Sequence, residues 1–146
     1  MNNKGFTLIE LLAVMAILGV IATIAYPNVM GIIEGTKKEK VIEDGKAFSS
    51  LAKYELTKNS SARDSIDSTG ITYSLNELDE KNTISLDPDG NYYDRNNSYI
   101  KVYKQNSVIS YCIYLDSIKY RLSNNENCVD YSIVTGDNSK NYVTIK

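Results

Sequence analysis

The stretch Lys4-Gly5-Phe6-Thr7-Leu8-Ile9-Glu10 opens an apolar run that lasts to Tyr26. Between Phe6 and the terminal tyrosine, Glu10 carries the only ionisable side chain. A run of about 20 apolar residues matches the thickness of the hydrocarbon core of a bilayer. A carboxylate inside such a run costs about 2.5–3.5 kcal/mol on insertion scales, so it indicates a functional site with a specific partner. The sequence therefore predicts a membrane helix in which Glu10 does more than anchor the chain.

Three interpretations of this run compete. A cleaved secretory signal fits Lys4 and the apolar core after it, but such a core usually runs about 7–15 residues and ends at a small-residue cleavage site. A plain single-span anchor explains the length of the run and leaves Glu10 unexplained. A processing site at Gly5-Phe6, ahead of the run, would keep the whole run in the mature chain.

The stretch from Lys4 to Leu11 resembles the processing and methylation motif of type IV prepilins and of their pseudopilin relatives. The likeness includes Gly19 inside the run and Pro27 at its end. It implies that residues 1–5 are a leader peptide, that a prepilin peptidase cuts between Gly5 and Phe6, and that the new Phe6 amine is methylated.

Cleavage would leave a cationic amine on Phe6, whose unperturbed pKa is near 8. Buried charges are tolerated when they are paired, and we therefore expect Glu10 of one subunit to meet the Phe6 amine of the next. Such a pair would set the axial register of packed helices, as a lone polar residue does in a coiled coil. The alternative is a contact within one subunit, because Phe6 and Glu10 lie four residues apart on one helix.

The orientation in the membrane is not decided by the lysines, because Lys4 precedes the span while Lys37, Lys38 and Lys40 follow it. The resemblance implies a single pass through the inner (cytoplasmic) membrane with a cytoplasmic amino terminus. It also implies an extracellular pilus after assembly.

Beyond Pro27, an apolar stripe continues at helical spacing and predicts an amphipathic helix half over residues 27–58. At 1.5 Å per residue, a helix from Phe6 to Leu56 would be about 75 Å long, whereas a domain of about 100 residues has a radius of gyration near 13 Å. We therefore expect a long protruding helix. Its apolar first half, residues 6–26, needs lipid or other helices to cover it.

The stretch between Gly19 and Pro27 has two interpretations. Glycine and proline both weaken a helix, so this stretch can serve to bend or unwind when the subunit leaves the bilayer. Small residues also allow membrane helices to pack closely. The sequence does not choose between helix flexibility and helix packing.

Residues 59–146 are predicted to form a globular head with one antiparallel β-sheet, laid on the apolar stripe of the second helix half. The strand-like runs are rich in Ile, Val, Tyr and Thr and are separated by Asn, Asp, Gly and Ser clusters. Their short connections favour antiparallel pairing. The fold class expected is α+β, with strands at 71–75, 83–86, 99–104, 108–115, 119–122, 129–134 and 142–145.

One loop of the predicted head is rich in oxygen ligands. Asp87, Asp89, Asn91 and Asp94 surround Gly90, and closely spaced oxygens with a glycine at the bend suit calcium. Some pseudopilins have a calcium-binding loop, so the resemblance supports this possibility. The pattern lacks the distal bidentate Glu of an EF-hand, and Pro-Asp-Gly is also an ordinary turn signal. A plain surface turn without a cofactor is the favoured interpretation.

The two cysteines, Cys112 and Cys128, both lie in the predicted head. A bridge between them would close a loop of about 15 residues and stabilise the head by about 3 kcal/mol in the chain-entropy model. A small domain outside the cytoplasm favours the bridge over two free thiols. The resemblance points the same way, since many pilins staple this end of the domain.

Composition limits the function. The 146 residues carry 16 basic and 18 acidic side chains and contain no His. Without His there is no imidazole base and no His metal ligand, and most hydrolase triads and zinc-hydrolase sites are excluded. No other catalytic pattern stands out, so we expect no enzyme, and the acidic net charge gives no basis for direct nucleic-acid binding.

The resemblance implies a structural subunit of a type IV pilus, a helical homo-oligomeric filament that is built by a pilus assembly machinery. The implied roles are surface attachment, aggregation and twitching motility. A pseudopilin of a type II secretion or DNA-uptake (competence) machine is the alternative within the same class. A monomeric membrane-anchored binding module is the alternative from another class.

Overall fold

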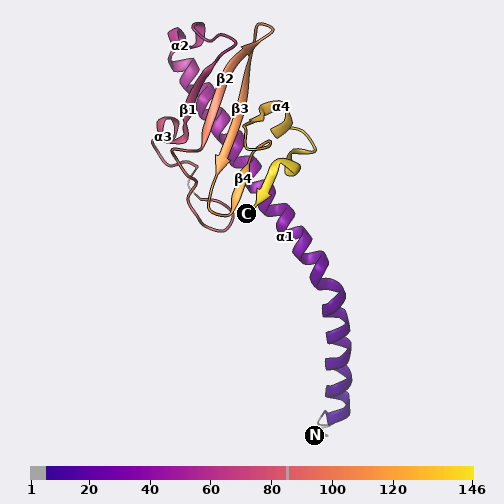
Figure 1. Ribbon diagram of the computed structural model, residues 1–146. Helices are drawn as coiled ribbons and strands as arrows, with labels where there is room; N and C mark the ends of the chain where they lie inside the picture. Colours follow the sequence, from indigo (N-terminus) through magenta and orange to yellow (C-terminus); the bar gives the residue numbers. More distant parts are fainter. Residues whose placement is uncertain (1–5, 85) are drawn as a thin grey trace. The chain divides into compact units, whose positions relative to one another are not determined.

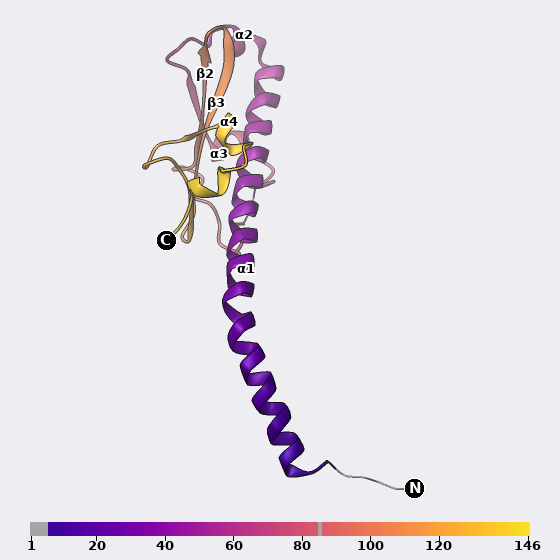
Figure 2. The same cartoon turned by 90° about the vertical axis from the view of Figure 1, so that its right-hand side faces the viewer.

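The computed structural model describes residues 6–84 and 86–146 (Figures 1 and 2). The chain divides into two compact units, Met1–Thr36 and Lys37–Lys146. The long helix α1 (Leu8–Lys58) supplies the described helical part of the first unit and the first element of the second. We call the second unit the head.

Helix α1 runs without a break through Pro27 and ends at Lys58, as the sequence predicts. Asn59 then caps α2 (Ser60–Asp64), because its side-chain oxygen accepts a hydrogen bond from the backbone N–H of Ala62 at 3.1 Å. An asparagine in this role starts a new helix while it ends the old one. The polar stretch after α1 therefore starts as a short helix.

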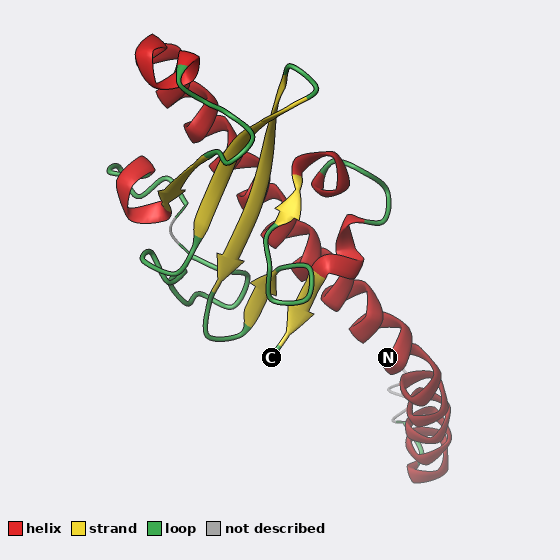
Figure 3. Cartoon of the chain, turned by 45° about the horizontal axis from the view of Figure 1, so that its top comes forward, coloured by secondary structure: helices red, strands yellow, loops and turns green. Residues whose placement is uncertain are grey.

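The head contains a six-stranded antiparallel sheet (Figure 3). Its order is β1-β2-β3-β4-β6, and β5 pairs with β3. A two-residue turn joins β2 to β3, and both of its residues, Asn106 and Ser107, have positive φ. Turns of this kind match the twist of paired strands. The strands are β1 (Ile71–Ser74), β2 (Tyr99–Gln105), β3 (Val108–Asp116), β4 (Tyr120–Leu122), β5 (Val129–Asp130) and β6 (Val143–Ile145).

The part of α1 that lies in the head packs against the sheet, as Figure 2 shows with the strands beside the helix. The helix and the sheet approach each other closely at Gly45, since a Cβ built there would lie 2.8 Å from Cδ2 of Leu122. The α+β class with one antiparallel sheet on the second helix half is confirmed. The buried apolar side chains of α1 are Val41, Ile42, Phe48, Ala52 and Leu56, and those of the sheet include Ile100, Val102, Ile113, Leu115 and Leu122.

Two predicted strands are wrong in part. The run 129–134 is a strand only at Val129–Asp130 and then turns into α4 (Tyr131–Val134), because Asp130 caps the backbone N–H of Ser132. The described residues of the run 83–86 make a single bridge, Leu86 to Tyr92, instead of a strand. Further short elements are α3 (Leu75–Leu78) and the 3-10 helix η1 (Ser139–Tyr142).

Candidate functional site: the amino-terminal segment and the acidic loop

The amino-terminal segment, residues 6–34, contains the predicted site residues Phe6 and Glu10. Lys4 and Gly5 lie outside the described residues. The Glu10 carboxylate accepts hydrogen bonds from the backbone N–H of Thr7 at 2.8 Å and from its hydroxyl at 2.7 Å. In return, the backbone N–H of Glu10 donates to the Thr7 hydroxyl at 3.4 Å. This reciprocal pair is a capping box at the start of α1.

The capping box assigns a role to Thr7 that the sequence interpretation missed. The Ser/Thr-x-x-Glu pattern was visible as Thr7-Leu8-Ile9-Glu10. In the single chain, the Glu10 carboxylate has donors within its own first helical turn, the N–H and hydroxyl of Thr7. The contact between Glu10 and the Phe6 amine stays a prediction, because that amine exists only after cleavage.

Among the described residues, none covers the exposed amino-terminal part of α1, residues 6–34. Every residue from Phe6 to Glu34 is exposed. Among the described residues, α1 is the one helix that is long and apolar enough to cross a membrane, and none of its most apolar stretch is buried. The large side chains left exposed include Leu8, Ile9, Leu12, Ile17, Leu18, Ile21, Ile24, Val29 and Ile32.

Three glycines of α1, one in the first half and two early in the second, are not required by packing against the described residues. A Cβ added at Gly19, Gly31 or Gly35 would meet no atom within 4 Å. Pro27 lies inside the helix, and the side chain of Asn28 donates to the Ile24 carbonyl at 3.3 Å. Flexibility at Gly19 and Pro27 and packing between subunits both stay predictions.

The head is cross-linked by the expected disulfide between Cys112 and Cys128, whose Cα atoms are 5.2 Å apart. Cys112 lies in β3 opposite Asp130, and Cys128 immediately precedes β5. The bridge therefore fastens the shortest strand to the central one. Two residues pair there, and a pairing of that length has little stability of its own.

The acidic loop (Leu86–Asp94) is folded around Asp87. The buried Asp87 carboxylate accepts bonds from the backbone N–H groups of Asp89 and Asn91, both at 2.9 Å, and from the Ser117 hydroxyl at 2.8 Å. The Asn91 amide also donates to both carboxylate oxygens. Burial raises the pKa of Asp87, but these hydrogen bonds outweigh it and hold the pKa below its usual value.

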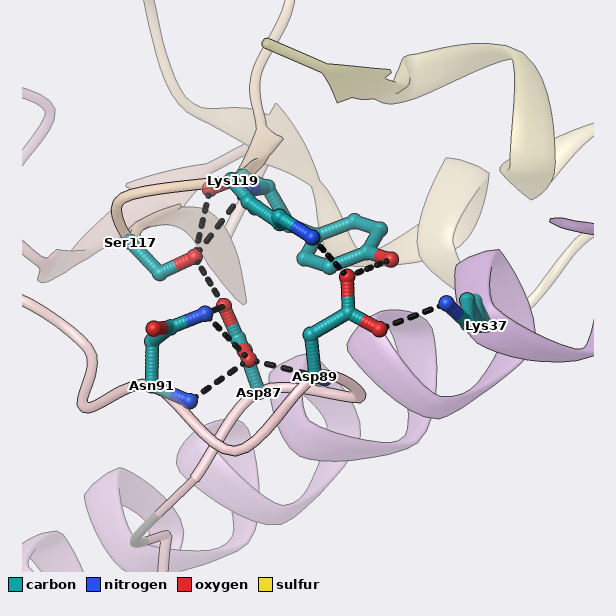
Figure 4. Close-up of polar contacts among 7 residues, drawn as sticks. Lys37, Asp87, Asp89, Asn91, Ser117 and Lys119 are labelled. Carbon is teal, nitrogen blue, oxygen red and sulfur yellow. Dashed lines mark hydrogen bonds and ion pairs between the residues drawn. The ribbon is translucent and has the colours of Figure 1, made fainter.

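Asp89 turns away from Asp87 toward two lysines (Figure 4). The Lys37 ammonium lies 2.5 Å from one carboxylate oxygen, and the Lys119 ammonium lies 2.9 Å from the other. The hydroxyl of the buried Tyr120 donates to the second oxygen at 3.0 Å. The hydrogen bonds from Lys37, Lys119 and Tyr120 keep the pKa of Asp89 far below its usual range.

The four residues of the predicted calcium loop are not brought to a common point. Asp94 is bonded to its own turn, where it accepts from the backbone N–H groups of Asn96 and Asn97. Among the described residues, no group of three or more acidic or cysteine side chains is arranged to hold a metal ion. The loop behaves as a hydrogen-bonded turn whose carboxylates bind donors from the protein.

A buried carboxylate on α1 also belongs to this region and was missed by sequence reasoning. Asp44 accepts a hydrogen bond from the hydroxyl of the buried Tyr93 at 2.8 Å, and it pairs with Lys40 one turn earlier. Burial, together with the negative charge of Asp44, raises the pKa of Tyr93. The two residues lie 49 positions apart, so no local pattern marks the pair.

Comparison with known proteins finds a family match for the amino-terminal segment and relatives that match part of the chain. A family model described as "Prokaryotic N-terminal methylation motif" matches residues 1–26. A "Type II secretion system core protein G" of Klebsiella pneumoniae is 46% identical over 43 residues, which are 30% of this chain and 31% of the relative. The proteins of the same name from Dickeya chrysanthemi and Pectobacterium carotovorum subsp. carotovorum are 44% identical over 56 residues and 40% identical over 59.

The aligned part spans 37% of the Dickeya relative and 38% of the Pectobacterium relative, so the chain matches little more than a third of their length. These matches cover 38% and 40% of this chain. No solved structure matches the chain. The chain therefore combines a prepilin methylation motif at residues 1–26 with homology, over part of its length, to type II secretion system core protein G. Its long helix packed on an antiparallel sheet is a pilin-like α+β arrangement.

Proposed function

We propose that this chain is a filament subunit that is stored in the membrane through its first helix half and polymerises through the same half. The observation that carries the proposal is the uncovered apolar surface from Phe6 to Glu34. A helix that is apolar all round is stable only when something covers it. Lipid would cover it before assembly, and the helices of other subunits would cover it in the filament. The role is structural and needs no catalysis by this chain.

Assembly would exchange the partner of Glu10. In the single chain the carboxylate is held by the backbone and hydroxyl of Thr7. After a prepilin peptidase has cut at Gly5-Phe6, the amine of a neighbouring Phe6 offers a charged partner instead. A pair of opposite charges attracts more strongly than a carboxylate and a neutral donor do, above all in an environment of low dielectric constant. Because successive subunits meet through different surfaces, the contact repeats and generates an open filament.

A pseudopilin of a type II secretion machine is the favoured member of this class. The support is the name that the matched relatives share, type II secretion system core protein G. The prepilin peptidase and the assembly machinery of such a system are the partners that the motif implies. A DNA-uptake machine would use the same kind of subunit.

A type IV pilus subunit for attachment, aggregation and twitching motility is the second candidate. The Cys112–Cys128 bridge favours it, because many pilins staple this end of the head. Disulfides persist in oxidising compartments, which supports a head outside the cytoplasm. The amino terminus, on the other side of the span, would then be cytoplasmic.

Substitution of Glu10 tests the class. Glu10→Ala should abolish filaments in material sheared from cells, while the chain still fractionates with the membrane. Glu34→Ala is the matched control, since it removes an exposed carboxylate beyond the apolar run of the same helix and should leave assembly intact. Absence of the unaltered chain from sheared filaments, with no effect of Glu10→Ala, would instead favour a monomeric membrane-anchored binding module.

Deletion of the gene separates the two members of the class. Loss of a secreted enzyme with normal surface motility would identify the pseudopilin. Loss of twitching and of surface filaments with normal secretion would identify the pilin.

A further inference from the structure

The acidic loop has the composition of a calcium site, but its carboxylates already have cationic and neutral donors. The side chain of Asp89 is only 17% exposed, with an ammonium group on each of its oxygens. Calcium takes six to eight oxygen ligands and needs several carboxylate oxygens directed at one point. In this head the oxygens of Asp87, Asp89 and Asp94 are directed at three different sets of donors.

We propose that two lysine side chains occupy the position in this head that a divalent cation would otherwise take. Lys37 and Lys119 both pair with Asp89, and their two positive charges offset two of the three negative charges that Asp87, Asp89 and Asp94 bring to the loop. We call the group Lys37, Lys119 and Asp89 the lysine clamp.

The lysine clamp joins parts of the head that are far apart in the sequence. Lys37 lies on α1, 52 residues before Asp89, and Lys119 follows β3, 30 residues after it. Figure 4 shows the two ammonium groups reaching Asp89 from two sides. A bound cation would connect loop segments through shared ligands, and the clamp makes the same connection between loop, helix and sheet.

Neighbouring contacts give the clamp a defined geometry. The Tyr120 hydroxyl, which is fixed by its buried ring, donates to the same oxygen of Asp89 as Lys119 does. The backbone N–H of Asp89 is held by Asp87, and Asp87 is held by Ser117 in the turn that also contains Lys119. Asp89 is therefore positioned on both its backbone and its side chain.

The clamp makes the loop independent of calcium, and amide hydrogen exchange of the full chain in detergent micelles tests this. Exchange in residues 86–94 should be the same in millimolar calcium and in a chelator. The double variant Lys37→Met, Lys119→Met should exchange about tenfold faster in this loop, because loss of two partly exposed pairs favours local opening. Exchange in β2 and β3 should not change.

Lys140→Met is the matched control. It breaks another long-range lysine pair of the head, with Glu39 at 3.1 Å, and should leave the loop as it is. Asp89→Asn should match the double lysine variant, and the triple variant should add little, because both lysines act through one carboxylate.

Calcium that slows exchange in the loop of the unaltered chain, or raises its melting temperature, would overturn the proposal. An unchanged loop in the double lysine variant would do so as well. The proposal does not rest on the function of the filament, and none of these readouts involves assembly.

Discussion

The two halves of α1 share one backbone conformation and differ in what covers them. From Phe6 to Glu34 every residue is exposed, whereas from Val41 onward one side of the helix is buried in the core of the head. The second half places polar residues between its apolar ones, and the first half has Glu10 as its one acid before Glu34. The comparison shows that helical structure follows from local sequence. The surface that covers an apolar helix can belong to another molecule.

The largest expected difference between the two halves is in the free energy of unfolding when one large side chain of each half is truncated to alanine. Phe48→Ala removes a fully buried ring and should lower the free energy of unfolding of the head by about 3–5 kcal/mol. Ile17→Ala truncates an exposed side chain and should leave that free energy unchanged. Urea unfolding in a mild detergent, followed by near-UV circular dichroism, measures both. A similar loss in the two variants would mean that Ile17 packs within the subunit.

Alanine substitutions of two glycines in the same helix should have smaller effects on stability, and the two effects should be opposite in sign. Gly45→Ala places a methyl group 2.8 Å from Leu122, and such overpacking should cost about 1–3 kcal/mol. Gly19→Ala meets no atom within 4 Å and should strengthen the helix by up to about 1 kcal/mol. Thermal melting of the head reports the first change, and helix content in micelles reports the second. A stabilised head in Gly45→Ala would contradict the close approach of α1 to the sheet.

The smallest expected effect is on how the free energy of unfolding depends on pH in acid. Since the pKa of Asp87 is lower in the folded head than in the unfolded chain, its contribution to stability is complete above the unfolded value of about 3.9. That contribution is lost as the pH falls through the folded pKa, because protonation then favours the unfolded chain. Asp87→Asn should therefore flatten the dependence of the unfolding free energy on pH below about 5. Glu10→Gln, in the other half of the comparison, should leave this dependence of the head unchanged.

Local patterns predicted most of the fold and one part of the site. The spacing of apolar residues identified α1 and its end near Lys58, and the runs rich in Ile, Val, Tyr and Thr identified β2 and β3. The Cys112–Cys128 bridge was also expected. The predicted strand at 129–134 was wrong in its second part because Asp130 caps a helix there, a choice between two local structures that depends on how β5 pairs with β3.

The sequence by itself therefore determined a long helix with an apolar first half and a lone acid, and a β-rich head behind it. These features depend on residues that lie within a few positions of one another, where helix and strand periodicity act. Only the tertiary structure decided that Asp44 meets Tyr93 and that Lys37 and Lys119 meet Asp89. Such contacts join residues 30 to 52 positions apart, and they form only after the packing of α1 on the sheet has brought those residues together.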